Sequence, residues 1–91
     1  MKVHYLKTIN PYFNEVWEGN KTFECRKNDR GFNVGDEVYL QEYNPETKEY
    51  SGREVRCDIK YLLTEEFELV YIGCCVFSIK ISQFITKQPH F

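Results

Sequence analysis

The chain has few of the residues that mark unusual protein classes. Of its 91 residues, 5 are glycine and 3 are proline, so collagen-like and low-complexity sequences are excluded. The longest mostly apolar stretch, Leu69–Phe77, is far shorter than the roughly 20 residues that span a bilayer. The first five residues contain no apolar run typical of a signal peptide. We therefore expect a cytoplasmic protein with no membrane contact.

Motifs for metal binding are also missing. The two histidines lie at opposite ends of the chain, and no pair of cysteines has the Cys-x-x-Cys spacing. Cys74 and Cys75 are adjacent, so on a strand they would point to opposite faces. We expect these two, together with Cys25 and Cys57, to be buried free thiols. No metal site and no cofactor are expected.

The composition that remains is that of one packed domain. Hydrophobic residues make up 42% of the chain, charged residues 29% and aromatic residues 16%. These proportions are typical of a globular protein and exclude a disordered segment. A chain of this length has room for one domain, which we assign to residues 1–91.

Hydrophobic periodicity predicts a mostly β protein of the α+β class. Alternating residues predict five strands, at His4–Ile9, Thr22–Arg26, Glu37–Tyr43, Arg53–Tyr61 and Tyr71–Ile81. A short helix, Pro11–Glu18, is predicted with Asn10 as its N-cap and Gly19 at its end. Five strands and one or two short helices suit a small antiparallel β-barrel.

Turn residues separate the predicted strands. Val34-Gly35-Asp36 is typical of a tight turn, and the polar residues Asn44–Lys48 predict a hairpin connection. Ser82–Phe91 has no clear period, so we expect it to lie outside the strands and its end to be mobile.

Charge is distributed unevenly along the chain. Between Gly19 and Gly31, four basic residues outnumber two acidic ones, which gives a local charge of +2. The remaining 8 basic and 12 acidic residues carry −4, so one basic segment lies in a chain of net charge −2. Phe23 and Cys25 face one side of the predicted strand there, and Thr22, Glu24 and Arg26 face the other.

The same segment resembles the ASCH (activating signal cointegrator homology) domain of the PUA-like superfamily. The resemblance rests on Gly19, Lys21, Thr22 and Arg26, followed by Val34-Gly35-Asp36. The resemblance covers about residues 5–80. Two later stretches, Glu42–Thr47 and Gly52-Arg53-Glu54, look like those of a small subfamily of bacterial and phage proteins.

This resemblance implies a PUA-like β-barrel and a role in RNA binding. One ASCH-type enzyme is an amidohydrolase that removes the acetyl group of acetylcytidine with a lysine, a threonine and a glutamate. The lysine corresponds to Lys21, whereas Glu24 stands in the place of the threonine. The glutamate of that enzyme has no clear counterpart here. The candidates are Glu65, Glu66 and Glu68.

We expect the segment to bind RNA or a modified nucleotide. Cationic side chains contact phosphates, Glu24 and Asn28 reach a base edge, and exposed tyrosines stack on unpaired bases. The candidate binding residues are Lys21, Thr22, Glu24, Arg26, Lys27, Asn28 and Arg30. The candidate stacking residues are Tyr39, Tyr43 and Tyr50.

Three other interpretations of the sequence stay open. Hydrolysis of an acylated nucleoside would use Lys21 and Glu24 as catalytic residues, and it requires a base with a pKa near neutrality and a nucleophile. A protein-binding adaptor would use the polar hairpin Asn44–Gly52. A salt-bridged surface strip would give the charged residues a purely structural role. The oligomeric state and any protein partner are open as well.

Overall fold

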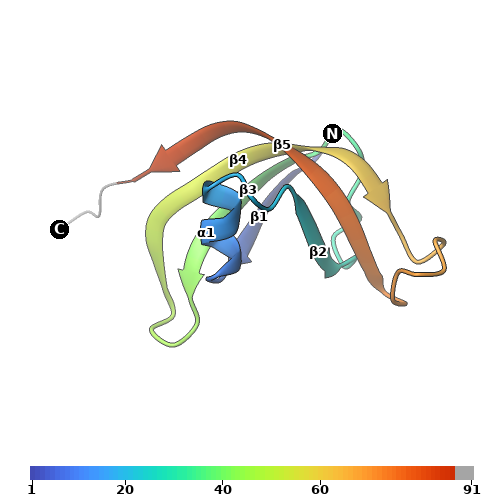
Figure 1. The fold of residues 1–91 in the computed structure, drawn as a ribbon, viewed down its shortest axis with the longest axis horizontal. Helices are drawn as coiled ribbons and strands as arrows, with labels where there is room; N and C mark the ends of the chain where they lie inside the picture. Colours follow the sequence, from blue (N-terminus) through green and yellow to red (C-terminus); the bar gives the residue numbers. More distant parts are fainter. Residues whose placement is uncertain (88–91) are drawn as a thin grey trace.

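The computed structural model describes residues 1–87, which form one curled sheet and one short helix (Figure 1). The elements are β1 (Val3–Thr8), α1 (Tyr12–Trp17), β2 (Phe23–Lys27), β3 (Glu37–Asn44), β4 (Glu49–Leu63) and β5 (Cys74–Thr86). The mostly β class predicted from periodicity is confirmed, with every predicted strand present and one short helix.

The five strands form a single mixed sheet in the order β1-β3-β4-β5-β2. Three neighbouring pairs are antiparallel, but β1 runs parallel to β3. The prediction of an antiparallel barrel is wrong on this point, because α1 and β2 form a crossover between β1 and β3 and so return the chain in the same direction. The sheet is a half-barrel with two edge strands, β1 and β2, which no backbone ladder joins within residues 1–87.

The concave face of the half-barrel holds the core. Alternation in β3 and β4 buries Val38, Leu40, Val55, Cys57 and Ile59, as the period-two pattern predicts. Figure 1 shows α1 lying beneath the arch of the sheet. The helix buries Phe13 and Val16 completely, so its apolar stripe covers the core as expected.

The helix boundaries differ slightly from the prediction. Pro11 is the N-cap residue, one position later than expected. The Asn10 side chain nevertheless accepts a hydrogen bond from the backbone N–H of Asn14 (2.9 Å), which satisfies a free donor of the first turn. Gly19, with φ of +82°, ends the helix and donates to the carbonyl of Val16 (3.0 Å).

The predicted Val34-Gly35-Asp36 turn is fastened to β1 by the Asp36 carboxylate. This group accepts hydrogen bonds from the Lys2 N–H (3.0 Å), the Asn33 N–H (3.0 Å) and His4 Nε2 (2.8 Å). Burial raises its pKa, but the hydrogen bonds from His4 and the two amides outweigh burial and lower the pKa overall. The turn thereby fixes where β3 starts against β1.

Strands β4 and β5 are longer than predicted. Ser82–Thr86, which we expected to lie outside the strands, continues β5 and pairs with the first part of β4. The register shifts where Arg56 pairs with Gln83 and Cys57 with Ile81. This irregularity leaves Ser82 as an extra residue and breaks the alternation that periodicity needs. The predicted mobile end, residues 88–91, lies outside the described residues.

The cysteines occupy different environments in the described chain. Cys57 and Cys75 are fully buried, whereas Cys25 is exposed and Cys74 is partly exposed, all as free thiols. The expectation of four buried thiols is therefore wrong for Cys25, because its face of the edge strand β2 is turned to solvent. Within residues 1–87, no helix has the length and apolar character needed to cross a membrane.

Candidate functional site

The candidate site is built around a buried carboxylate on β2. Glu24 is 3% exposed, although its strand neighbours Phe23 and Cys25 are exposed. This is the reverse of the usual arrangement, in which apolar residues face inward and charged residues face solvent. A buried charge is unfavourable unless it is paired and hydrogen-bonded, so the surroundings of Glu24 decide whether the arrangement is stable.

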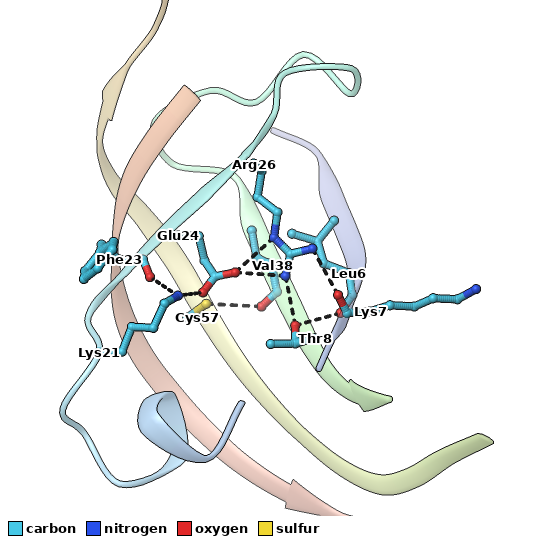
Figure 2. Close-up of polar contacts among 9 residues, drawn as sticks. All are labelled: Leu6, Lys7, Thr8, Lys21, Phe23, Glu24, Arg26, Val38 and Cys57. Atoms are coloured by element: carbon cyan, nitrogen blue, oxygen red, sulfur yellow. Dashed lines mark hydrogen bonds and ion pairs between the residues drawn. The ribbon is translucent and has the colours of Figure 1, made fainter. Parts of the chain in front are cut away.

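Two cations from the same segment neutralise Glu24. Lys21 pairs with Oε2 of the carboxylate and also donates to the carbonyl of Phe23 (2.6 Å). Arg26 donates to Oε1 through Nε (3.0 Å), and its Nη2 lies 2.9 Å from the same oxygen. Figure 2 shows the carboxylate held between the two side chains. Both carboxylate oxygens thus have charged donors, which offset the desolvation of the buried charge.

Arg26 also reaches across to the opposite edge of the sheet. Its Nη1 donates to the carbonyl of Lys7 (3.0 Å), and its Nη2 donates to the hydroxyl of Thr8 (3.0 Å). The line along which the two edge strands β1 and β2 face each other is called the seam. Further along it, Arg30 donates to the carbonyl of Tyr5 (3.3 Å). Side chains of the β2 side therefore close the half-barrel where its two edge strands meet, in place of a backbone ladder.

A first hollow of about 660 Å³ opens beside Glu24. Tyr12 and Phe23 line it and are about half exposed, at 54% and 48%. The charged residues in its lining are Lys7, Lys21, Glu24 and Arg26. The first hollow therefore combines aromatic walls with an oriented carboxylate and cationic donors, a composition typical of a site for a small polar ligand.

A second hollow of about 480 Å³ lies on the other side of Arg26. Lys7 and Arg26 line both hollows, so the two adjoin along the seam. The charged residues that line the second hollow are Lys7, Arg26, Lys27, Asp29 and Arg30. Four cations against one carboxylate make this the more positive of the two hollows.

The predicted binding residues divide between these two places. Lys21, Glu24 and Arg26 meet at the first hollow, and Arg26, Lys27 and Arg30 line the second. Thr22 lines neither hollow, since it precedes β2 and its carbonyl accepts a hydrogen bond from the N–H of Ile79.

The remaining candidates lie apart from the first hollow. The exposed Asn28 is fastened by its own backbone N–H, which donates to the carbonyl of Gly73. Glu65, Glu66 and Glu68 lie in the connection between β4 and β5 and line neither hollow. Of the three tyrosines, Tyr50 lines the second hollow, Tyr39 stacks on Tyr5 with ring centres 4.9 Å apart, and Tyr43 packs edge-on against Tyr50.

Sequence reasoning missed the contribution of β1 and the helix start. Thr8 is buried and bonded to Arg26, and Lys7 and Tyr12 line the first hollow. The sequence gives no sign of these contributions, because the three residues are distant from Lys21 along the chain. Lys7 and Thr8 lie on β1, which pairs in parallel with β3, and Tyr12 begins α1. Thr8 also lines the first hollow, and its hydroxyl accepts a hydrogen bond from Arg26 and donates to the carbonyl of Leu6 (3.2 Å).

A second charged cluster lies at the hairpin between β3 and β4. Arg53 pairs with Glu42 (2.8 Å), and its guanidinium lies over the rings of Phe13 and Trp17, at 5.2 and 4.8 Å from their centres. Hydrogen bonds from Arg53, Ser51 and Asn10 outweigh desolvation and lower the pKa of Glu42 to about 2. This cluster ties the hairpin to the helix.

A third hollow, the hairpin hollow, adjoins this cluster and is negatively charged, unlike the first two hollows. Its charged lining residues are Glu42, Glu46 and Glu49. It includes most of the Asn44–Gly52 hairpin that an adaptor would present.

Comparison with known proteins places the chain in a family. The model of a family described as "Domain of unknown function (DUF3850)" matches residues 3–79. The chain belongs to this family. The matched residues run from β1 into β5, so they include both edge strands and every charged residue of the first and second hollows.

A phage protein is similar to part of this chain. The "Uncharacterized 12.9 kDa protein in GpA 3'region" of Escherichia phage P2 is 38% identical over 58 residues. The aligned part covers 64% of this chain and 51% of the phage protein, about half of that relative's length. The similarity agrees with the predicted likeness to bacterial and phage proteins and carries no activity with it.

Proposed function

We propose that this DUF3850 domain binds RNA or a nucleotide, with a base in the first hollow. The observation that supports the proposal most directly is a carboxylate only 3% exposed, fixed between two cations, at the edge of an open hollow with aromatic walls. We also propose the finer assignment of the half-barrel to the PUA-like, ASCH-type fold, which the positions of Gly19, Lys21, Thr22 and Arg26 and the turn at Gly35 support.

The chemistry of the hollow suits a nucleobase. A glutamate accepts hydrogen bonds from amino groups on a base edge, such as N4 of cytosine. Lys21 uses two of its three protons on Glu24 and Phe23, which leaves one for a base carbonyl. Phe23 and Tyr12 offer exposed ring surface for stacking, a contact worth about 1–3 kcal/mol per base.

A purely structural role explains only part of this arrangement. The contacts of Arg26 with β1 do stabilise the seam, and Glu24 orients Arg26. Seam closure does not require Lys21 or the exposed rings of Phe23 and Tyr12, whose side chains make no hydrogen bond, ion pair or aromatic contact across the seam in the described chain. These three side chains are the ones that a ligand would touch.

The proposal is tested by two-dimensional NMR of labelled protein, titrated with nucleosides, nucleotides and short single-stranded RNAs. We expect shift changes centred on Lys21, Phe23 and Glu24. Lys21→Ala and Phe23→Ala should each weaken binding on the order of tenfold. The matched control is Lys60→Ala, which removes an exposed lysine of β4.

Three results would contradict the proposal. Unchanged affinity in both variants would remove the site assignment, and absence of any shift with every ligand would favour the adaptor interpretation. Acetylcytidine is included in the panel because loss of its acetyl signal over hours would replace simple binding with hydrolysis. In that case Lys21→Ala should abolish turnover.

A further inference from the structure

We infer that the ligand carries a phosphate group that binds in the second hollow, so that the recognised class is a nucleotide or an RNA strand rather than a free nucleoside. This inference rests on the proposed function, because it places the base in the first hollow. It assigns a separate role to residues that line the second hollow and do not touch Glu24.

Three of the four cations of the second hollow, Lys7, Lys27 and Arg30, have no carboxylate partner among the described residues, unlike Arg26, which is paired with Glu24. The side chain of Lys27 is exposed and makes no hydrogen bond or ion pair among residues 1–87. Arg30 is exposed and uses one of its five N–H donors, on the carbonyl of Tyr5. Lys7 lies over the ring of Tyr43, 4.6 Å from its centre, without a carboxylate partner in the described chain. Asp29 is the single carboxylate in the lining.

The positions of the hollows fit a base joined to a phosphate. Lys7 and Arg26 line both hollows, so a ligand that leaves the first hollow along the seam passes directly into the second. The hairpin hollow also meets the first hollow, at Ile9, but its charged lining residues are all glutamates. Repulsion from these carboxylates directs a phosphate toward the second hollow.

The experiment compares each nucleoside with its 5′- and 3′-monophosphates by NMR titration and calorimetry. We expect at least one monophosphate to bind on the order of tenfold more tightly than its nucleoside. In Lys27→Ala/Arg30→Ala this advantage should disappear, while the nucleoside still produces shift changes in the first hollow. The matched control is Lys60→Ala/Lys80→Ala, which also removes two exposed positive charges but from β4 and β5.

A pentanucleotide distinguishes the two sources of phosphate. If the backbone of an RNA strand supplies it, the pentanucleotide binds more tightly than any mononucleotide. The logarithm of its affinity should then fall linearly with the logarithm of the salt concentration. Removing the two cations in Lys27→Ala/Arg30→Ala should reduce the magnitude of this slope by about 1.4. If a mononucleotide supplies it, the two bind alike. Both results support a phosphate site in the second hollow.

The outcomes for the two proposals are distinguishable. Equal binding of nucleosides and monophosphates, with shifts in the first hollow, would overturn the phosphate site and leave the proposed function intact. The same would follow if the control double variant lost as much affinity as Lys27→Ala/Arg30→Ala, because net charge alone would then be responsible. Absence of binding by every compound would overturn both.

Discussion

Arg26, on one edge strand of the sheet, donates a hydrogen bond to the backbone carbonyl of Lys7 on the opposite edge strand, 3.0 Å away. The same guanidinium holds Glu24. One side chain therefore closes the half-barrel and orients the carboxylate of the proposed site. Its removal should affect folding as well as binding, which changes what a binding experiment with an Arg26 variant can show.

Arg26→Ala should lower the free energy of unfolding by about 2–4 kcal/mol, since it leaves the buried Glu24 with one cation and removes two hydrogen bonds to β1. Urea unfolding followed by circular dichroism measures the change. The neighbouring Lys27→Ala, which removes an exposed side chain, should stay within about 0.5 kcal/mol of the wild type. Equal stabilities of the two variants would show that Arg26 does not close the seam.

The sequence predicted the strands better than their arrangement. In β4 the alternation that buries Val55, Cys57 and Ile59 is a local property, because side chains on a strand point to opposite faces. The parallel pairing of β1 with β3 is not local. It depends on the crossover through α1 and β2 that joins the two strands, and no residue of β1 reports it.

The site was predictable only where it is contiguous. Lys21, Glu24 and Arg26 lie within six residues, so their charges mark the segment as a candidate site from the sequence alone. Which face of β2 is buried could not be read from the pattern, because Arg26, the partner of Glu24, is held by Lys7 and Thr8 of the other edge strand. The ion pairs of Glu24 are local, whereas the contacts that close the seam are long-range.

Glu24→Gln should destabilise the protein by about 1–3 kcal/mol, because it keeps the shape of the side chain but leaves two cations without their counter-charge. The double variant Lys21→Met/Glu24→Gln should lose less stability than Glu24→Gln alone, because it also removes one of the two cations. A double-mutant cycle on Lys21 and Glu24, measured by urea unfolding, should give a coupling of about 1–2 kcal/mol. Additive effects would mean that the contact between them contributes nothing to stability.

Acid should weaken the hairpin through Glu42. Its pKa is lowered from 4.5 to about 2 in the folded protein, chiefly by hydrogen bonds from Arg53. A depressed folded pKa gives stability that is fully present above about pH 5 and is lost as the pH falls toward 2. The free energy by which the wild type is more stable than Glu42→Gln should therefore decrease across that range. The expected decrease is on the order of 2 kcal/mol, because solvent partly screens the charge of Arg53.

The baseline for this measurement is Glu46→Gln. Glu46 lies in the exposed hairpin turn and has no ion pair in the described chain, so Glu46→Gln removes a carboxylate from the same hairpin without breaking an ion pair. A difference between the wild type and Glu42→Gln that stays constant from pH 6 to pH 2 would contradict the coupling of Glu42 to Arg53.

Thiol reactivity should separate the four cysteines by their position in the sheet. Burial raises the pKa of Cys57 to about 12 and also raises that of Cys75, so the reactive thiolate is scarce at both positions and a reagent cannot reach them. Cys25 is exposed on β2. Brief treatment with iodoacetamide at pH 8, followed by mass spectrometry of peptides, should label Cys25 first and Cys57 last. Labelling of Cys57 should rise only over the urea range in which the protein unfolds, and rapid labelling in native buffer would show that the concave core between β4 and β3 opens locally.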